Sequence, residues 1–182
     1  LTAAGAVVEQ IEATGVGKHV RARVPGREPG ERPLLVLGHL DTVHPLGTLA
    51  ARPFRVEGDR AYGPGIYDMK AGLVVIVEAL MRLRAAGTQP RRPLVLLVTC
   101  DEEAGSGTSR SLIEAEAREA GVALVLEPPL ANGAAKTARK GVAIYHLCVT
   151  GRPAHAGLEP ERGVSAVVEL AHQILRVMEL AD

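Results

Sequence analysis

The residues whose types could do chemistry follow three apolar runs of the chain, at 34–38, 94–99 and 123–126. They are one imidazole and several carboxylates: His39, Asp41, Asp101, Glu102, Glu103 and Glu127. The runs are typical of strands buried on both faces. Because open α/β sheets bind ligands beyond the carboxyl ends of their strands, we expect these side chains to gather at one edge. A further carboxylate, Asp68, lies in the glycine-rich segment 63–70, just before a helical pattern.

Each of these residues has a common alternative role when it is taken alone. A His-x-Asp sequence is frequent, Asp68 could cap the helix that follows it, and Glu127 could lie in a surface turn before two prolines. Convergence on one edge favours a shared role, because unpaired carboxylates repel one another and a cation compensates them. Imidazole mixed with carboxylates, without a thiolate cluster, favours zinc or a similar divalent ion used in catalysis.

Positions within the cluster suggest separate tasks. Asp41, two residues after His39, can hydrogen-bond the far ring nitrogen and fix the tautomer. Asp68 is placed to bridge two ions, and two such ions together activate water for attack on a carbonyl. Neighbouring side chains diverge, so one of Glu102 and Glu103 can bind metal while the other faces the water as a base.

The elements that must position these residues alternate between strand and helix, which predicts an α/β fold with a mostly parallel sheet flanked by helices. The expected strands are 19–24, 34–38, 94–99 and 123–126, with a hairpin of 54–56 and 60–62; the expected helices are 3–13, 69–86 and one capped by Thr108 or Ser109 that runs to Ala120. From about residue 138 the pattern changes to a half-exposed strand at 142–149, a loop, and an amphipathic helix over 164–178.

Composition excludes several classes of function. The 21 basic residues balance 21 acidic ones, so no net charge points to nucleic acid or an anionic membrane. Four aromatic residues provide no stacking platform for bases, and no apolar run approaches the length of a membrane span. Cys100 and Cys148, both in strand-like segments, are expected to be buried core thiols and not a disulfide framework or a zinc ribbon.

Five stretches, in order from about residue 34 onward, resemble the co-catalytic zinc carboxypeptidases and deacylases typified by glutamate carboxypeptidase, a family that includes aminoacylases and acetylornithine deacetylase. The matching stretches are Gly38–Val43, Pro53–Gly65, Asp68–Lys70, Asp101–Glu103 and Ala154–Gly157. The resemblance implies a zinc-exopeptidase-like catalytic domain, of which residues 1–137 are the N-terminal part. It also implies that residues 138–182 begin a smaller α+β lid or dimerisation domain.

The resemblance implies a ligand set for two zinc ions, with cobalt or manganese as substitutes. His39 and Glu127 would bind one ion, Asp68 would bridge the pair, and Glu103 would bind the second. A cis peptide bond is implied after Asp68. The family takes one more histidine for the second ion from a later segment, so we expect this chain to hold about half of an enzyme.

Roles in the reaction are also implied by the resemblance. Glu102 would be the general base that activates the water and passes the proton to the leaving amine, and Asp41 would support His39. His155 would reach the active site of a neighbouring subunit and stabilise the oxyanion, which implies a homodimer formed through the lid domain. The other histidines, His19, His44, His146 and His172, are expected to lie in strands, loops or on the lid helix without binding metal.

The leading interpretation is a metal-dependent hydrolase that cleaves an amide bond next to a free carboxylate and releases a C-terminal amino acid such as glutamate. Deacylation of an N-acyl amino acid is an alternative with the same metal ligands. A truncated, non-catalytic module that binds metal or dimerises is a third. We expect a cytoplasmic protein, with the periplasm and secretion as alternatives. The chain opens on Leu1 and not on Met, so its N-terminus does not indicate the compartment.

Overall fold

Five strands form one mixed sheet in the computed structural model, which describes residues 1–180. The strand order is β1 (Val7–Ile11), β2 (His19–Val24), β6 (Leu94–Thr99), β3 (Leu34–His39) and β7 (Val122–Val125). The pairs β6–β3 and β3–β7 are parallel, whereas β1–β2 and β2–β6 are antiparallel. The expected α/β class is confirmed. The sheet is less parallel than expected, but the three strands that precede the chemical residues do run in parallel.

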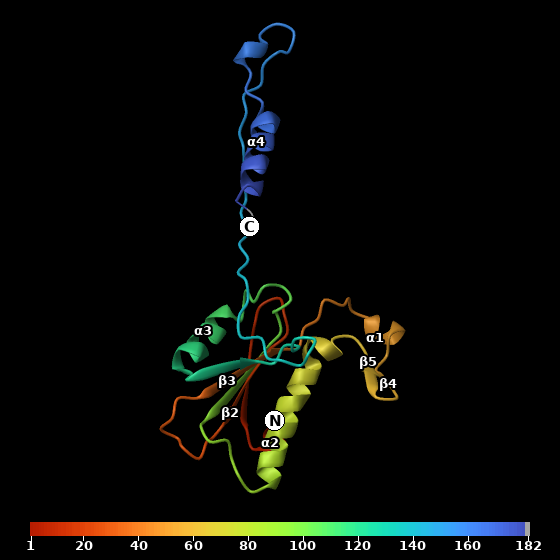
Figure 1. Ribbon diagram of the computed structural model, residues 1–182, viewed down its shortest axis with the longest axis vertical. Coiled ribbons are helices and arrows are strands. Elements are labelled where there is room, and N and C mark those ends of the chain that lie inside the picture. Colours follow the sequence, from red (N-terminus) through yellow and green to blue (C-terminus); the bar gives the residue numbers. More distant parts are fainter. Residues whose placement is uncertain (181–182) are drawn as a thin grey trace. The chain divides into compact units, whose positions relative to one another are not determined.

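Helices cover both faces of this sheet, α2 (Ala71–Ala85) on one and α3 (Arg110–Glu119) on the other (Figure 1). On the α2 face, the buried residues Val36, Leu96 and Val98 pack with Leu80. On the α3 face, Leu35, Val95 and Leu97 pack with Leu112 and Ile113. Successive strand residues therefore enter opposite halves of the core, which explains why β3 and β6 are continuous apolar runs.

Residues 3–13 were expected to form a helix, and this expectation is wrong. Thr2–Ala4 is a short 3-10 turn (η1), and Val7–Ile11 is the edge strand β1, in register with β2 so that Glu9 faces Arg21. The Arg21 guanidinium donates hydrogen bonds to Glu9 Oε2 at 2.6 and 3.0 Å. Three β-branched residues in five, together with this cross-strand pair, favour the strand over the helical pattern.

A small hairpin lies outside the main sheet. Its strands are β4 (Arg55–Glu57) and β5 (Arg60–Tyr62), which confirms the expected hairpin, and Gly58 at their turn has a φ of 62°. A short helix, α1 (Thr48–Ala51), precedes it, and the turn η2 (Ile66–Lys70) leads into α2.

A second compact unit begins at Thr137, and each unit is described by itself. This division lies one residue from the expected boundary, while the assignment of the second unit to a lid remains a prediction. The unit contains a bridge between Arg152 and Val164, a 3-10 turn η3 (Pro160–Arg162), and the helix α4 (Ala166–Met178), whose first turn is capped by Ser165 Oγ. None of the helices in residues 1–180 is long and apolar enough to cross a membrane.

The strand expected at 142–149 does not form in the structure, where residues 135–150 have no regular hydrogen-bonding pattern. A strand needs a partner to pair its backbone groups, and within the described residues this segment has none. Cys148 is consequently exposed and Cys100 is half-buried, so the expectation that both are core thiols is wrong.

Candidate metal centre

Strand register brings the predicted residues to one edge of the sheet. His39 pairs with Thr99 and Leu37 pairs with Val125, so β3, β6 and β7 end at nearly the same level. The residues that follow β6 and β7 therefore continue from the same edge at which β3 ends in His39. This is the carboxyl edge of the parallel strands, where a ligand site is expected in such sheets.

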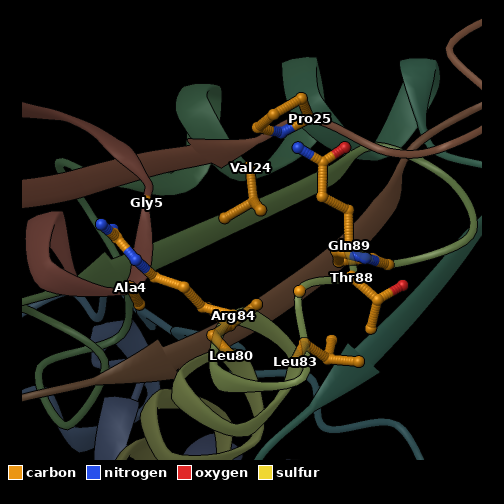
Figure 2. A pocket seen from close by; sticks show the side chains of 11 residues that line it. Ala4, Gly5, Val24, Pro25, Leu80, Leu83, Arg84, Thr88 and Gln89 are labelled. Atoms are coloured by element: carbon orange, nitrogen blue, oxygen red, sulfur yellow. The ribbon is translucent and has the colours of Figure 1, made fainter.

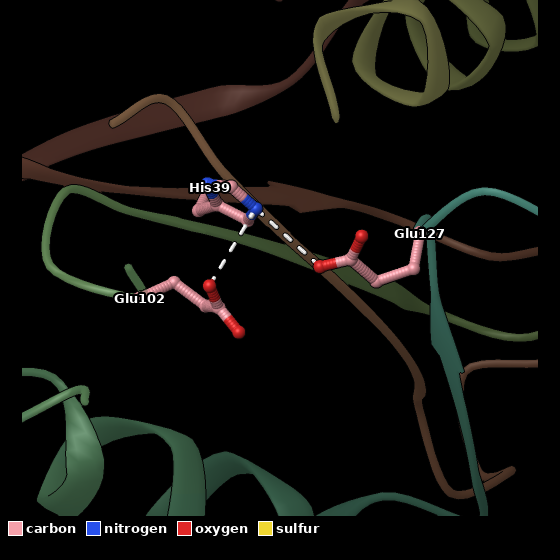
Figure 3. A group of neighbouring side chains, drawn as sticks. All are labelled: His39, Glu102 and Glu127. Atoms are coloured by element: carbon pink, nitrogen blue, oxygen red, sulfur yellow. Dashed lines mark ion pairs between the residues drawn. The ribbon is translucent and has the colours of Figure 1, made fainter. Parts of the chain in front are cut away.

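His39 is the buried centre of the cluster, with only 1% of its surface exposed. Its Nδ1 lies 3.0 Å from the backbone oxygen of Asp41, a contact that an Nδ1–H group makes as donor. The other ring nitrogen, Nε2, then presents a lone pair to three carboxylates. The distances from Nε2 are 3.1 Å to Asp68, 3.3 Å to Glu127 and 3.8 Å to Glu102 (Figure 3 shows the last two). A lone pair among carboxylates requires a cation or a proton between them.

Asp41 contributes differently from the expected way. Its backbone oxygen contacts His39 Nδ1, and its carboxylate Oδ1 lies farther from that nitrogen, at 3.4 Å. The second carboxylate oxygen, Oδ2, accepts a hydrogen bond of 2.9 Å from the backbone N–H of Glu103. Asp41 thus connects the end of β3 to the loop after β6, and both connections end at a predicted metal ligand.

Asp68 lies in the turn η2 just before α2, and its peptide bond to Met69 is cis, as the family resemblance implies. Asp68 does not cap α2, because the N-cap residue is Lys70 and no side-chain hydrogen bond caps that helix. Met69 is buried, and its sulfur accepts a hydrogen bond from the backbone N–H of His39. The turn is therefore fixed to the end of β3, with the Asp68 carboxylate beside Nε2 of His39.

Glycines let α2 approach the sheet closely at this edge. A Cβ at Gly38 would lie 2.6 Å from Leu73 Cδ2, and a Cβ at Gly72 would overlap the backbone oxygen of Leu126. The backbone contact at Gly72 leaves no space for a side chain, whereas at Gly38 the Leu73 side chain would have to shift. The close approach places the start of α2, which follows Asp68, directly beside the residue that precedes Glu127.

Two groups of side chains have ligand atoms close enough together to hold an ion. One is His39, Glu102 and Glu127, and the other is His39, Asp68 and Glu103; in each, the ligand atoms all lie within 4.8 Å of one another. The structure therefore brings all four predicted ligands together, and it also places the predicted base, Glu102, in the first group. The assignment of ligand and base roles within the cluster stays a prediction.

The electrostatics of the cluster fit a divalent cation. Burial, together with the negative charges of Asp68 and Glu102, raises the pKa of Glu127, although His39 opposes this. Burial disfavours the charged form of His39, but the Asp41 backbone contact and the nearby carboxylates outweigh it and raise the pKa of the imidazole. Both directions are those expected where several carboxylates surround one imidazole, and oxygen and imidazole donors suit zinc.

The remaining histidines lie outside both candidate groups. His19 is buried and hydrogen-bonded to Thr108, and His44 Nδ1 accepts a hydrogen bond from Arg52. His146, His155 and His172 are exposed in the second unit, where His155 Nδ1 accepts a hydrogen bond of 3.1 Å from the backbone N–H of Gly157. The role of His155 toward a neighbouring active site stays a prediction.

Sequence reasoning grouped Asp101 with the acidic cluster, but its side chain is buried against the start of α3. Its Oδ2 accepts hydrogen bonds from Thr108 and Ser109. Burial raises the pKa of Asp101, yet these hydrogen bonds outweigh it and lower the pKa to about 2. Ser109 is the N-cap residue of α3 without a capping side-chain bond, so Asp101 performs the capping instead. In the sequence, Asp101 precedes Thr108 and Ser109 by a short glycine-containing loop, and this spacing is the signal that could have indicated the capping role of Asp101.

A cavity of about 280 Å³ lies at the opposite edge of the sheet (Figure 2). It adjoins Val24, which pairs with the first residue of β6, and Pro90, which precedes that strand. Its other lining residues are Ala4, Gly5, Pro25, Leu80, Leu83, Arg84, Gly87, Thr88 and Gln89. The candidate metal centre is thus separate from this cavity.

The fold and the cluster of acidic residues with one histidine are those of a metallohydrolase family. The profile of peptidase family M20/M25/M40 matches residues 35–180, and the chain belongs to this family. The family is metal-dependent, and the two candidate groups provide suitable side chains for an ion.

The chain is similar in sequence to two proteins that are named as a carboxypeptidase and a deacetylase. The chain is 40% identical over 181 residues to carboxypeptidase G2 of Pseudomonas sp. (strain RS-16), covering 98% of this chain and 43% of the relative. It is 34% identical over 154 residues to acetylornithine deacetylase of Salmonella arizonae, covering 82% of this chain and 38% of the relative. The chain therefore spans less than half the length of these relatives.

The fold is also found in a solved structure, that of aminopeptidase PepT from Bacillus cereus. The TM-score is 0.68 at 23% identity, and the match covers 96% of this chain and 48% of that one. This likeness confirms the α/β fold.

Proposed function

We propose that the protein to which this chain belongs is a zinc-dependent hydrolase that cleaves an amide bond next to a free carboxylate and releases a C-terminal amino acid such as glutamate. The observation that carries this proposal is the cluster around His39 Nε2 at the carboxyl edge. Its support from homology is the 40% identity to a carboxypeptidase over nearly the whole chain.

The residues that would hold the metal come from four segments: the end of β3, the turn η2, the loop after β6 and the segment after β7. His39 and Glu127 would bind one ion, Asp68 would bridge, and Glu103 would bind the second. When bound, two zinc ions supply Lewis acidity that polarises the scissile carbonyl and lowers the pKa of water; cobalt or manganese could replace them. Asp41 orients this set, because it contacts the His39 ring and holds the backbone N–H of Glu103.

Glu102 is the proposed general base. Its side chain is about half exposed, and its Oε2 lies 3.8 Å from His39 Nε2, so it is both beside the ligands and open to a substrate. A carboxylate oxygen of Glu102 would take a proton from the attacking water and then deliver it to the nitrogen of the leaving amine.

Deacylation of an N-acyl amino acid is the second candidate, and the relation to acetylornithine deacetylase favours it. Both reactions break an amide bond, and the same ligands and base serve both. Substrates of both reactions have a free α-carboxylate. They differ on the acyl side of the bond, which is a peptidyl or larger acyl group in one case and a small acyl group in the other.

The test is hydrolysis by the whole protein, loaded with zinc, of matched amides. N-acyl glutamates with a free α-carboxylate should be cleaved, and the corresponding α-carboxamides should not. Equal cleavage of both would contradict the carboxypeptidase proposal. Preference for acetyl over larger acyl groups, with tolerance of ornithine, would support the deacylase, and zinc binding without any hydrolysis would indicate a non-catalytic module.

We also propose that the protein is a homodimer in which His155 serves the active site of the other subunit. The support is its exposed position in a unit that has no candidate ion-binding group in its described residues. Mixing a His155→Ala protein with a Glu102→Gln protein should restore activity through mixed dimers. No restoration, despite demonstrated subunit exchange, would disprove the role in trans.

A further inference from the structure

A chain of partly buried hydrogen bonds fastens the two ends of the loop that carries Glu102 and Glu103. Asp101, at the start of the loop, is only 3% exposed. Its Oδ2 accepts hydrogen bonds from Thr108 N and Thr108 Oγ1, both at 2.7 Å, and from Ser109 N at 3.0 Å. One carboxylate oxygen therefore holds the end of the loop to its beginning.

His19, on the neighbouring strand β2, extends this chain. Its Nδ1 accepts a hydrogen bond of 3.2 Å from the backbone N–H of Cys100, so the ring proton is on Nε2. Nε2 lies 3.0 Å from Thr108 Oγ1 and donates to it. The Thr108 hydroxyl then donates its own proton to Asp101, and every hydrogen of this relay has one acceptor.

The backbone of the loop is fixed between these two ends. The Asp101 backbone oxygen accepts hydrogen bonds from Ser106 N at 2.8 Å and Ala104 N at 3.3 Å, and Gly105 N donates to Glu102 O at 2.8 Å. Glu103 N donates to Asp41 Oδ2. Glu102 and Glu103 have exposed side chains on a backbone that is fastened on both sides.

We propose that His19, Asp101 and Thr108 are positioning residues that set the location of Glu102 and Glu103 relative to His39. The proposal rests on the proposed function of those two glutamates, since none of the three residues is itself in either candidate ion-binding group. Groups that orient ligands from behind typically change metal affinity or activity by about 10- to 100-fold when they are removed.

The test replaces the central hydroxyl in the whole protein. Thr108→Val removes the acceptor for His19 and one donor to Asp101 while keeping the shape of the side chain. Thr108→Ser keeps the hydroxyl. Thr88→Val makes the same change at the opposite edge of the sheet, where Thr88 lines the cavity.

In zinc-loaded protein, Thr108→Val should lower kcat about 10- to 100-fold with KM within about twofold. Thr108→Ser and Thr88→Val should stay within about threefold of the wild type. An unchanged kcat in Thr108→Val, or an equal loss in Thr108→Ser, would overturn the proposal, because the hydroxyl would then not matter.

Amide hydrogen exchange of the metal-free protein gives an independent measurement. In Thr108→Val, the amides of residues 103–106 should exchange faster than in the wild type, while those of β6 keep their rates. Unchanged exchange at 103–106 would overturn the proposal. If the wild type hydrolyses nothing, the proposed function fails, and the exchange rates still decide whether the loop is fastened by Thr108. If Thr108→Val does not fold, His19→Leu, which removes both ring nitrogens, is measured in its place with the same expected results.

Discussion

The two edges of the sheet both carry several acidic residues, but they neutralise them differently. At the amino edge, Glu28 pairs with Arg91 at 3.0 Å and Glu31 pairs with Arg92 at 3.3 Å. At the carboxyl edge, Asp68, Glu102 and Glu127 surround His39, and no lysine or arginine of the described chain forms an ion pair with them.

This difference shows how an acidic cluster can be interpreted. Acids that are paired with arginine within the chain need no further positive charge, and such exposed pairs add little to stability. Acids gathered around one buried imidazole need positive charge from outside the chain. The carboxyl edge is thus a candidate ion site because of the missing partners as much as because of the acids present.

The largest expected difference between the two edges is in the effect of a glutamate substitution on kcat. In the whole enzyme, Glu102→Gln should lower kcat about 10²- to 10⁴-fold, because a general base typically contributes that much, and bound zinc should be retained. The matched change Glu31→Gln at the amino edge should leave kcat unchanged. Steady-state kinetics and elemental analysis measure both. Loss of zinc in Glu102→Gln would instead make Glu102 a ligand.

The next effect concerns metal affinity. Asp68→Ala removes the predicted bridge, and zinc affinity should fall by at least about 100-fold, the upper end of what supporting residues contribute. Glu28→Ala should bind zinc like the wild type, because its carboxylate is already paired with Arg91. Competition with a chromophoric chelator gives both constants. Equal zinc affinities in Asp68→Ala and Glu28→Ala would contradict the assignment of the ion site to the carboxyl edge.

The smallest effect is on stability in acid. The pKa of Asp101 is lowered from 3.8 to about 2 in the folded chain. Ionised Asp101 therefore contributes stability that is fully present above about pH 4 and is lost as the pH falls through about 2. This contribution is about 2 kcal/mol. Urea denaturation of metal-free protein between pH 5 and 2 should show a smaller loss for Asp101→Asn than for the wild type. If the free energy of unfolding fell equally with pH in both proteins, ionised Asp101 would not stabilise the folded chain.

The carboxyl edge could be predicted from the sequence because two of its three strands, β3 and β6, are buried on both faces, although β7 is exposed, contrary to the expectation of a third buried strand. The runs at 34–38 and 94–99 have no polar interruption, so their ends are clear and the residues after them are necessarily at the edge. The family resemblance then supplied roles for individual residues. The direction of the Asp101 side chain was not predictable in this way, because it depends on Thr108 and His19 from other elements.

Segments with weak or absent partners were predicted least well. Val7–Ile11 has residues that fit a helix pattern, and pairing with β2 decides that it is a strand. Residues 142–149 alternate like a strand, but alternation alone does not supply the partner that a strand needs, and none is present among the described residues. Local periodicity describes what a segment prefers, and long-range pairing decides what it forms.

The close approach of α2 to the sheet has a consequence for how the site can vary. The spacing between Asp68 and Glu127 depends on backbone packing at Gly72, where an added methyl group would overlap the oxygen of Leu126. A methyl group at position 72 would push α2 away from Leu126 and widen this spacing without replacing any ligand residue, so the geometry of the cluster depends on the absence of a side chain at Gly72.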